Sequence, residues 1–119
     1  MTNNVNTPSG IVRNRLDNMT GGWFVGAFHP AALSTSDVEV AVQHFPAGYQ
    51  SAAHHHKIAT EVTLLLRGEA LMAGERLIAG DILTLAPGIS SSFIALTDCV
   101  TVVVKHPGAL NDKYVDGVL

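Results

Sequence analysis

The sequence predicts an all-β protein, and two observations carry that prediction. The apolar stretches are short runs of Val, Ile, Leu, Phe and Thr that recur along the chain between Gly, Pro, Asp and Ser residues. Residues of the first group favour strands, those of the second favour turns, and their close spacing is typical of a sandwich or barrel. In addition, no stretch shows convincing helical periodicity. Short strands must hide their edges, which a double-sheet jelly roll or a small barrel achieves.

Nine strands are expected, and turn residues separate them. The strands cover residues 22–28, 38–45, 50–55, 62–67, 69–72, 76–79, 82–86, 91–96 and 100–105. Ala73-Gly74 predicts a hairpin turn, and Gly80-Asp81 and Pro87-Gly88 predict turns on either side of the strand 82–86. We expect residues 1–10 to form a flexible tail and residues 11–119 to form a single domain. The segment from Pro107 is expected to wrap the surface or to reach a partner.

Charge and hydropathy exclude two classes of partner. The 119-residue chain has a formal net charge of -3 and no run of Lys or Arg, which argues against nucleic acid. No apolar stretch approaches the roughly 18 residues of a membrane span, which argues against a membrane partner. The polar N-terminus lacks the apolar core of a signal peptide, so we expect a cytoplasmic protein.

The surface and the single cysteine each support one expectation. Only 14% of the residues are charged, whereas 47% are hydrophobic. This sparse polar coat predicts that part of the surface is covered by a second copy, so we expect a homodimer. Cys99 cannot form an internal disulfide and is expected to be a small buried residue in a strand.

A histidine cluster is the one arrangement in the sequence that suggests chemistry. It consists of His54, His55 and His56, and Glu61 follows at the start of the next apolar run. Side chains alternate between the two faces of a strand, so His54 and His56 can point the same way while His55 points to solvent or an interface. If the run after Glu61 is a neighbouring strand, its carboxylate can meet both imidazoles. Two His and one carboxylate form a metal-ligand set that leaves positions open for a substrate or for oxygen.

The spacing of these residues resembles the first sequence motif of the cupin superfamily. Gly48, His54, His56, Glu61 and Gly68 match the pattern G-x5-H-x-H-x4-E-x6-G at every fixed position, and residues 80–88 resemble the second motif. The resemblance implies a cupin-type jelly-roll β-barrel, also called a double-stranded β-helix. It further implies a divalent metal (Fe, Zn, Mn or Ni) on His54, His56 and Glu61, in a pocket that takes a small molecule. The segments 56–61 and 111–114 are similar to those of a subgroup of small cupins.

The second motif departs from the family pattern at the position of its histidine. Aligning Gly80 and Gly88 with that motif places Ser91 where the family has a third histidine ligand. Ser91 and Phe93 share one strand parity and are expected to line the pocket, as is Thr63, two residues after the motif glutamate. A hydroxyl is a poor substitute for imidazole on a divalent metal. The three remaining ligands therefore form either a weaker metal site or a polar cluster without metal.

Four further side chains are candidates for the pocket. His44 has the parity of the valines in the strand 38–45, so it can face inward and replace the missing ligand; the alternative is a structural histidine with satisfied hydrogen bonds. Arg67 continues the parity of Glu61, and its guanidinium can hold a carboxylate or phosphate at one end of the pocket; the alternative is a solvated strand end. Trp23 and Tyr49 can stack on a substrate ring or can belong to the core or an interface.

Two kinds of function are left open by these residues. The first is a metal-dependent enzyme that acts on a small organic or sugar-like molecule, for example as a dioxygenase, isomerase or lyase. The second is a non-catalytic cupin that binds a ligand, or a structural one with a vestigial metal site. Fold alone does not choose between them. The sequence offers no Ser-His-Asp arrangement, phosphate loop or dinucleotide fingerprint as a rival chemistry.

Overall fold

The computed structural model describes residues 10–109 and 111–116, and these residues form ten strands and two short 3-10 helices. The all-β prediction is confirmed, and each of the nine expected strands overlaps an observed one. The helices are η1 (Leu16–Asn18) and η2 (Thr20–Gly22). The strands are β1 (Trp23–Val25), β2 (Glu39–Phe45), β3 (His54–His55), β4 (Thr60–Arg67), β5 (Glu69–Met72), β6 (Glu75–Ile78), β7 (Ile82–Leu85), β8 (Phe93–Ala95), β9 (Cys99–His106) and β10 (Tyr114–Val115).

Two features of the ends of the chain bear on the predictions. The expected tail, residues 1–10, lies outside the described residues except for Gly10. Strand β10 has no counterpart among the expected strands, and it pairs antiparallel with β3. Within the described residues, no helix has the length and apolar character needed to cross a membrane. The cytoplasmic location and the single-domain boundary stay predictions.

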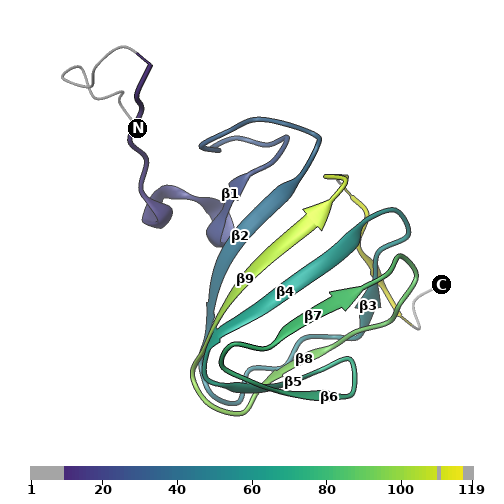
Figure 1. The fold of residues 1–119 in the computed structure, drawn as a ribbon. Coiled ribbons are helices and arrows are strands. Elements are labelled where there is room, and N and C mark those ends of the chain that lie inside the picture. The colour runs from purple at the N-terminus through teal and green to yellow at the C-terminus, as the bar shows by residue number, and fades with distance from the viewer. Residues whose placement is uncertain (1–9, 110, 117–119) are drawn as a thin grey trace.

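The strands lie in two layers (Figure 1). The larger layer is a five-stranded antiparallel sheet in the order β1-β2-β9-β4-β7. The other layer contains the three-stranded sheet β6-β5-β8 and the pair β10-β3. Isolated bridges from Gln50 to Ile94 and from His54 to Ser91 join the chain around β3 to the β8 side. This arrangement of two antiparallel layers is that of a jelly roll.

Strand β9 lies at the centre of the larger sheet and fixes which side chains point between the layers. It pairs with β2 on one side and β4 on the other, so that Val103 lies opposite both Ala41 and Thr63. These three side chains are buried, as are Glu61 and Leu65 in β4 and Thr101 in β9, whereas Lys105 is half-buried. The odd-numbered residues of the three central strands therefore face inward, apart from a bulge at the end of β4.

The interior is divided into an apolar end and a polar end. The apolar core lies around the end of β4 and the start of β9, and it includes Cys99, which is free and buried as expected. Its members are Leu65, Ala70, Met72, Leu77, Leu85, Phe93, Ala95 and Cys99. The buried side chains at the other end of the same strands are polar, among them Glu39 and Glu61. The apolar end holds the layers together, and the polar end is free to form a site.

Candidate metal centre

A cavity of about 520 Å³ opens at the polar end of the interior. Its volume lies in the range of pockets that hold small organic molecules. Aromatic rings form part of its wall, and five charged side chains project from the rest. The charged residues are Glu39, Glu61, Lys105, Asp112 and Lys113.

His54, His56 and Glu61 meet on the wall of this cavity. Each offers one ligand atom, and these atoms all lie within 4.8 Å of one another. Nδ1 of His56 lies 3.6 Å from Oε1 of Glu61, and the two imidazole rings are nearly perpendicular with centroids 5.6 Å apart. The structure thus brings together the three residues that the motif singled out, from the β3 segment and from β4.

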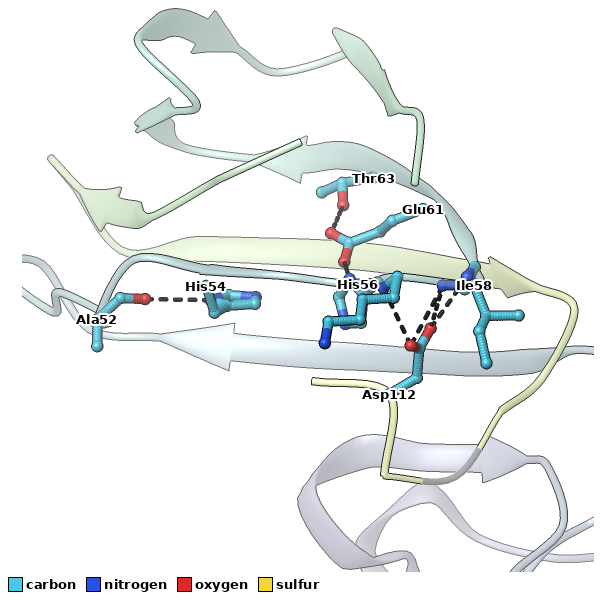
Figure 2. Close-up of polar contacts among 9 residues, drawn as sticks. Ala52, His54, His56, Ile58, Glu61, Thr63 and Asp112 are labelled. Atoms are coloured by element: carbon cyan, nitrogen blue, oxygen red, sulfur yellow. Dashed lines mark hydrogen bonds and ion pairs between the residues drawn. The ribbon is translucent and has the colours of Figure 1, made fainter. Parts of the chain in front are cut away.

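Hydrogen bonds orient two of the three side chains (Figure 2). Nδ1 of His54 lies 3.1 Å from the carbonyl oxygen of Ala52. Because a carbonyl only accepts, the neutral ring donates from Nδ1 and keeps the lone pair of Nε2 free for a metal. The Thr63 hydroxyl donates to Oε2 of Glu61 over 2.9 Å, which leaves Oε1 turned toward His56. Partners of this kind fix the orientation of metal ligands.

His56 carries the clearest sign of a missing partner. The side chain is 7% exposed, and its Nε2 atom is buried without a hydrogen bond to any described residue. Burial lowers the pKa of His56, and the charge of Lys105 lowers it further, against the opposing effect of Glu61. The imidazole is therefore neutral at pH 7 and can ligate. A buried nitrogen without a partner costs free energy, which a bound metal ion would recover.

Two buried hydroxyls on the cavity wall also lack hydrogen-bond partners within residues 10–109 and 111–116. Oγ of Ser91 and Oγ1 of Thr101 make no hydrogen bond within the described part of the chain, although these residues are only 5% and 1% exposed. Ser91 lies directly opposite His54, since the two residues exchange backbone hydrogen bonds of 2.8 Å. Its side chain therefore shares a face with the His54 imidazole. Both hydroxyls are available to a ligand in the cavity.

Asp112 holds the loop between the second histidine and the glutamate. Its carboxylate accepts hydrogen bonds from the backbone N–H groups of Lys57, Ile58 and Ala59 at 2.9–3.2 Å (Figure 2). Burial of the carboxylate raises its pKa, but the three backbone donors and nearby His56 outweigh burial, so the pKa of Asp112 lies below its ordinary value. The carboxylate is ionised at neutral pH and fixes the backbone between His56 and Glu61.

The residues around Asp112 fasten the same segment from outside. His55 faces away from the cavity, and its Nδ1 lies 2.7 Å from Oδ1 of Asp116. The other carboxylate oxygen of Asp116, Oδ2, accepts a hydrogen bond from the Ser90 hydroxyl. The ammonium of Lys57 lies 4.1 Å from the ring centroid of Tyr114. The C-terminal segment, expected to wrap the surface or reach a partner, thus packs on the strand that carries the histidines.

The remaining predicted pocket residues fall into two groups. Thr63, Ser91 and Phe93 lie on the cavity wall. The structure places His44 and Arg67 outside the cavity, with exposed side chains, which corrects the prediction that both line it. His44 lies on the outward parity of β2. The ladder between β4 and β9 shifts register between Leu65 and Arg67, so the inward alternation ends before the arginine.

Sequence reasoning missed several side chains on the cavity wall, among them Glu39, Thr101, Lys105 and Asp112. Glu39 on β2 and Thr101 and Lys105 on β9 lie at the alternate strand positions that were not predicted to face the interior. The presence of the polar residues Thr101 and Lys105 within a run of valines was the signal that could have identified the inward face of β9. Trp23 and Tyr49 also line the cavity, which agrees with the ring-stacking alternative without establishing it.

Comparison with known proteins identifies the fold family. No family model matches the sequence, and no curated protein matches it significantly. Among solved structures, a protein with a double-stranded β-helix domain from Klebsiella pneumoniae is 30% identical, over 68% of this chain and 75% of that one, with a TM-score of 0.60. The chain belongs to the cupin (double-stranded β-helix) superfamily.

Other similar structures share the cupin fold at lower identity. A cupin-2 domain protein from Shewanella frigidimarina is 17% identical over 60% of this cupin and 72% of its own chain, with a TM-score of 0.53. The DMSP lyase DddQ from Ruegeria pomeroyi is 20% identical over 79% of this cupin and 49% of its own chain, with a TM-score of 0.67. At these identities the likeness establishes the fold alone.

The anchoring role of Asp112 predicts a pH-dependent loss of stability. We expect Asp112→Asn to lower the free energy of unfolding by about 2 kcal/mol at pH 7, because an amide accepts the backbone bonds less strongly than a carboxylate. A depressed pKa contributes stability above the ordinary value of 3.8, and that stability is lost as the pH falls through the lower folded value. The difference between the two proteins should therefore shrink below about pH 4. Urea unfolding at pH 7 and pH 3 measures it.

Asp37→Asn is the matched control, since the Asp37 side chain is exposed. It should leave the unfolding free energy unchanged at both pH values. An Asp112→Asn protein with the stability of the parent at pH 7 would contradict the anchoring role.

Proposed function

We propose that this cupin is a metalloprotein in which His54, His56 and Glu61 hold a divalent metal and the adjoining cavity takes a small organic molecule. The observation that carries the proposal is the buried Nε2 of His56, which has no hydrogen-bond partner within the described residues and lies in a set of three metal-ligating groups. Two imidazoles and one carboxylate suit Fe, Zn, Mn or Ni.

The chemistry of such a centre suits a metal-dependent enzyme. Three protein ligands leave coordination positions open, and a bound divalent cation would polarise a substrate oxygen there. The chain's own residues would then do the positioning. Thr63 holds the glutamate, and the Ala52 carbonyl fixes the His54 tautomer.

A non-catalytic cupin is the second candidate, and Ser91 is the observation that favours it. Ser91 replaces the third histidine of the family pattern, which weakens metal binding and can leave a site that binds a ligand without turnover. Elemental analysis of untagged protein, followed by a screen of small organic acids and sugars for turnover and for binding, separates the two candidates. Metal-dependent turnover supports the enzyme, and binding without turnover supports the alternative.

Removing either histidine of the centre should abolish metal binding. We expect His54→Ala and His56→Ala to weaken binding of Ni²⁺ or Zn²⁺ by about 100-fold or more, since each removes a ligand rather than a supporting contact. Binding should also weaken as the pH falls through the histidine range, because imidazolium cannot ligate. Equilibrium dialysis with metal analysis measures both effects.

His44→Ala is the matched control, because it removes an exposed imidazole outside the cavity. Its metal content should equal that of the parent. Unchanged metal content in both His54→Ala and His56→Ala would rule out this centre.

Restoring the missing imidazole should strengthen the centre. We expect Ser91→His to raise the affinity for Ni²⁺ or Zn²⁺, because residue 91 lies directly opposite His54 and shares its inward face. The measurement is the same dialysis experiment, with thermal unfolding as a check on the fold. Equal affinity in a folded Ser91→His protein and the parent would mean that position 91 does not reach the metal.

We also propose that a second copy of the chain covers the outer face of the larger sheet. The face consists of two rows of uncharged side chains, so a second copy can cover it without burying a charge. The rows are Val40, Val104, Val62 and Thr84, and Val42, Val102, Leu64 and Ile82. Leu66 and Ile82 at its margin are 56% and 64% exposed.

A charge on this face should dissociate the homodimer. Ile82→Asp is expected to give a folded monomer, since Ile82 is exposed and lies on an edge strand. Sedimentation velocity at micromolar concentration measures the state of each protein. Ile89→Asp, an exposed isoleucine in the loop after β7, is the control that should stay dimeric. A parent protein that sediments only as a monomer would end the dimer proposal.

A further inference from the structure

Three charged residues form a row across the larger sheet at the polar end of the interior, where the cavity lies. Lys105 on β9 lies opposite Glu39 on β2 and opposite Glu61 on β4. All three side chains line the cavity. Figure 1 shows β9 between the other two strands, so the lysine lies between the two glutamates. The row therefore places the charges of Glu39 and Lys105 beside the candidate metal ligand Glu61. Neither of these two charges is needed to hold the proposed metal.

The ammonium of Lys105 lacks a polar partner among the residues that the structure describes. It makes no hydrogen bond or ion pair with any residue that the structure describes, and the one contact identified is with the ring of Trp23, 4.7 Å from Nζ to the centroid. An ammonium carries three donors, and a half-buried charge without hydrogen bonds is unfavourable. Burial lowers the pKa of Lys105, and the charges of Glu61 and Glu39 oppose this only in part, so the pKa lies below its ordinary value. An anionic group in the cavity would supply the missing hydrogen bonds.

The charge balance of the wall sets the charge of the ligand. Three carboxylates (Glu39, Glu61 and Asp112) and two ammonium groups (Lys105 and Lys113) leave a net charge of one minus. The proposed divalent metal turns this into one plus, with His56 neutral. A ligand with a single negative charge would make the site neutral, which is the favourable state for charges removed from water.

Two orphan hydroxyls indicate further oxygens on the ligand. Thr101 lies on the same inward face of β9 as Lys105, about 13 Å away at four residues of ~3.3 Å each. Ser91 lies opposite the candidate ligand His54. Buried hydroxyls are normally hydrogen-bonded, and hydroxyl or carbonyl groups of a ligand would satisfy them.

We propose that Lys105 binds the carboxylate of the substrate, and that the cavity takes small monoanionic organic acids that also carry hydroxyl or carbonyl oxygens. The proposal rests on the proposed function, because the charge balance includes the metal. It assigns Lys105 as the residue that selects an acid over its neutral analogue. The alternative role for Lys105 is only to balance the charges of Glu39 and Glu61.

The test compares glycolate with its neutral analogue glycolamide by titration calorimetry on Ni²⁺-loaded and metal-free protein. In the parent, glycolate should bind more tightly than glycolamide. Lys105→Met should weaken glycolate binding about tenfold or more and change glycolamide binding much less, because only the acid loses an ion pair with the ammonium. Lys105→Arg should retain part of the preference. Arg67→Met is the control, since it removes a positive charge outside the cavity and should change neither affinity.

Each outcome bears on one proposal. Glycolate affinity that is unchanged in Lys105→Met, or a parent that binds the two probes equally, overturns the role of Lys105 while Ni²⁺ content still supports the metal centre. If the parent holds no Ni²⁺, the metal centre fails, and the metal-free titrations alone decide whether glycolate binding depends on Lys105. If Lys105→Met does not fold because two glutamates lose their counter-charge, the double variant Glu39→Gln/Lys105→Met restores the balance and repeats the comparison.

Discussion

The pairing of β9 with β2 and β4 is the constraint on which the site depends. Because β9 is hydrogen-bonded on both sides, a change of register by one residue would turn its whole inward set of side chains to the outside. The same pairing puts Lys105 between Glu39 and Glu61 and puts Thr101 opposite Leu65. One ladder thus sets the position of the charged row at one end of the interior and the start of the apolar core at the other.

Along part of its larger sheet, this cupin reverses the usual alternation of a β-sandwich. Polar side chains face the interior there, and apolar side chains face outward. In β9 the even positions 100, 102 and 104 are valines that face outward, whereas the odd positions Thr101, Val103 and Lys105 face the cavity. A rule that places apolar residues inside assigns the wrong parity to such a strand. That is why His44, which shares the outward parity of β2, was expected in the pocket, while Glu39 and Lys105 were not. This reversed alternation produces both the polar cavity and the apolar outer face of the sheet.

Local patterns predicted the strands well because turns and β-branched runs are local signals. The hairpin at Ala73-Gly74 shows why, since both residues have positive φ and join Met72 directly to Glu75 in the β5–β6 ladder. The motif spacing likewise grouped the histidines with Glu61. Non-local contacts could not be read in this way. The register shift before Arg67 and the bonds from Asp112 to residues some fifty positions earlier depend on how distant segments pack.

The contacts between the histidine segment and the C-terminal segment couple two equilibria. These are the docking of the C-terminal segment and the binding of a ligand at His56. Asp112 and β10 are docked only when the backbone around Lys57 is in place, and that backbone carries His56 into the cavity. Whatever binds at His56 must therefore also hold the C-terminal segment down, and to the same extent, because such coupling is reciprocal. Amide protons at residues 57–59 exchange with solvent only when this clamp opens. Their exchange rates therefore report the occupancy of the cavity from residues that do not line it.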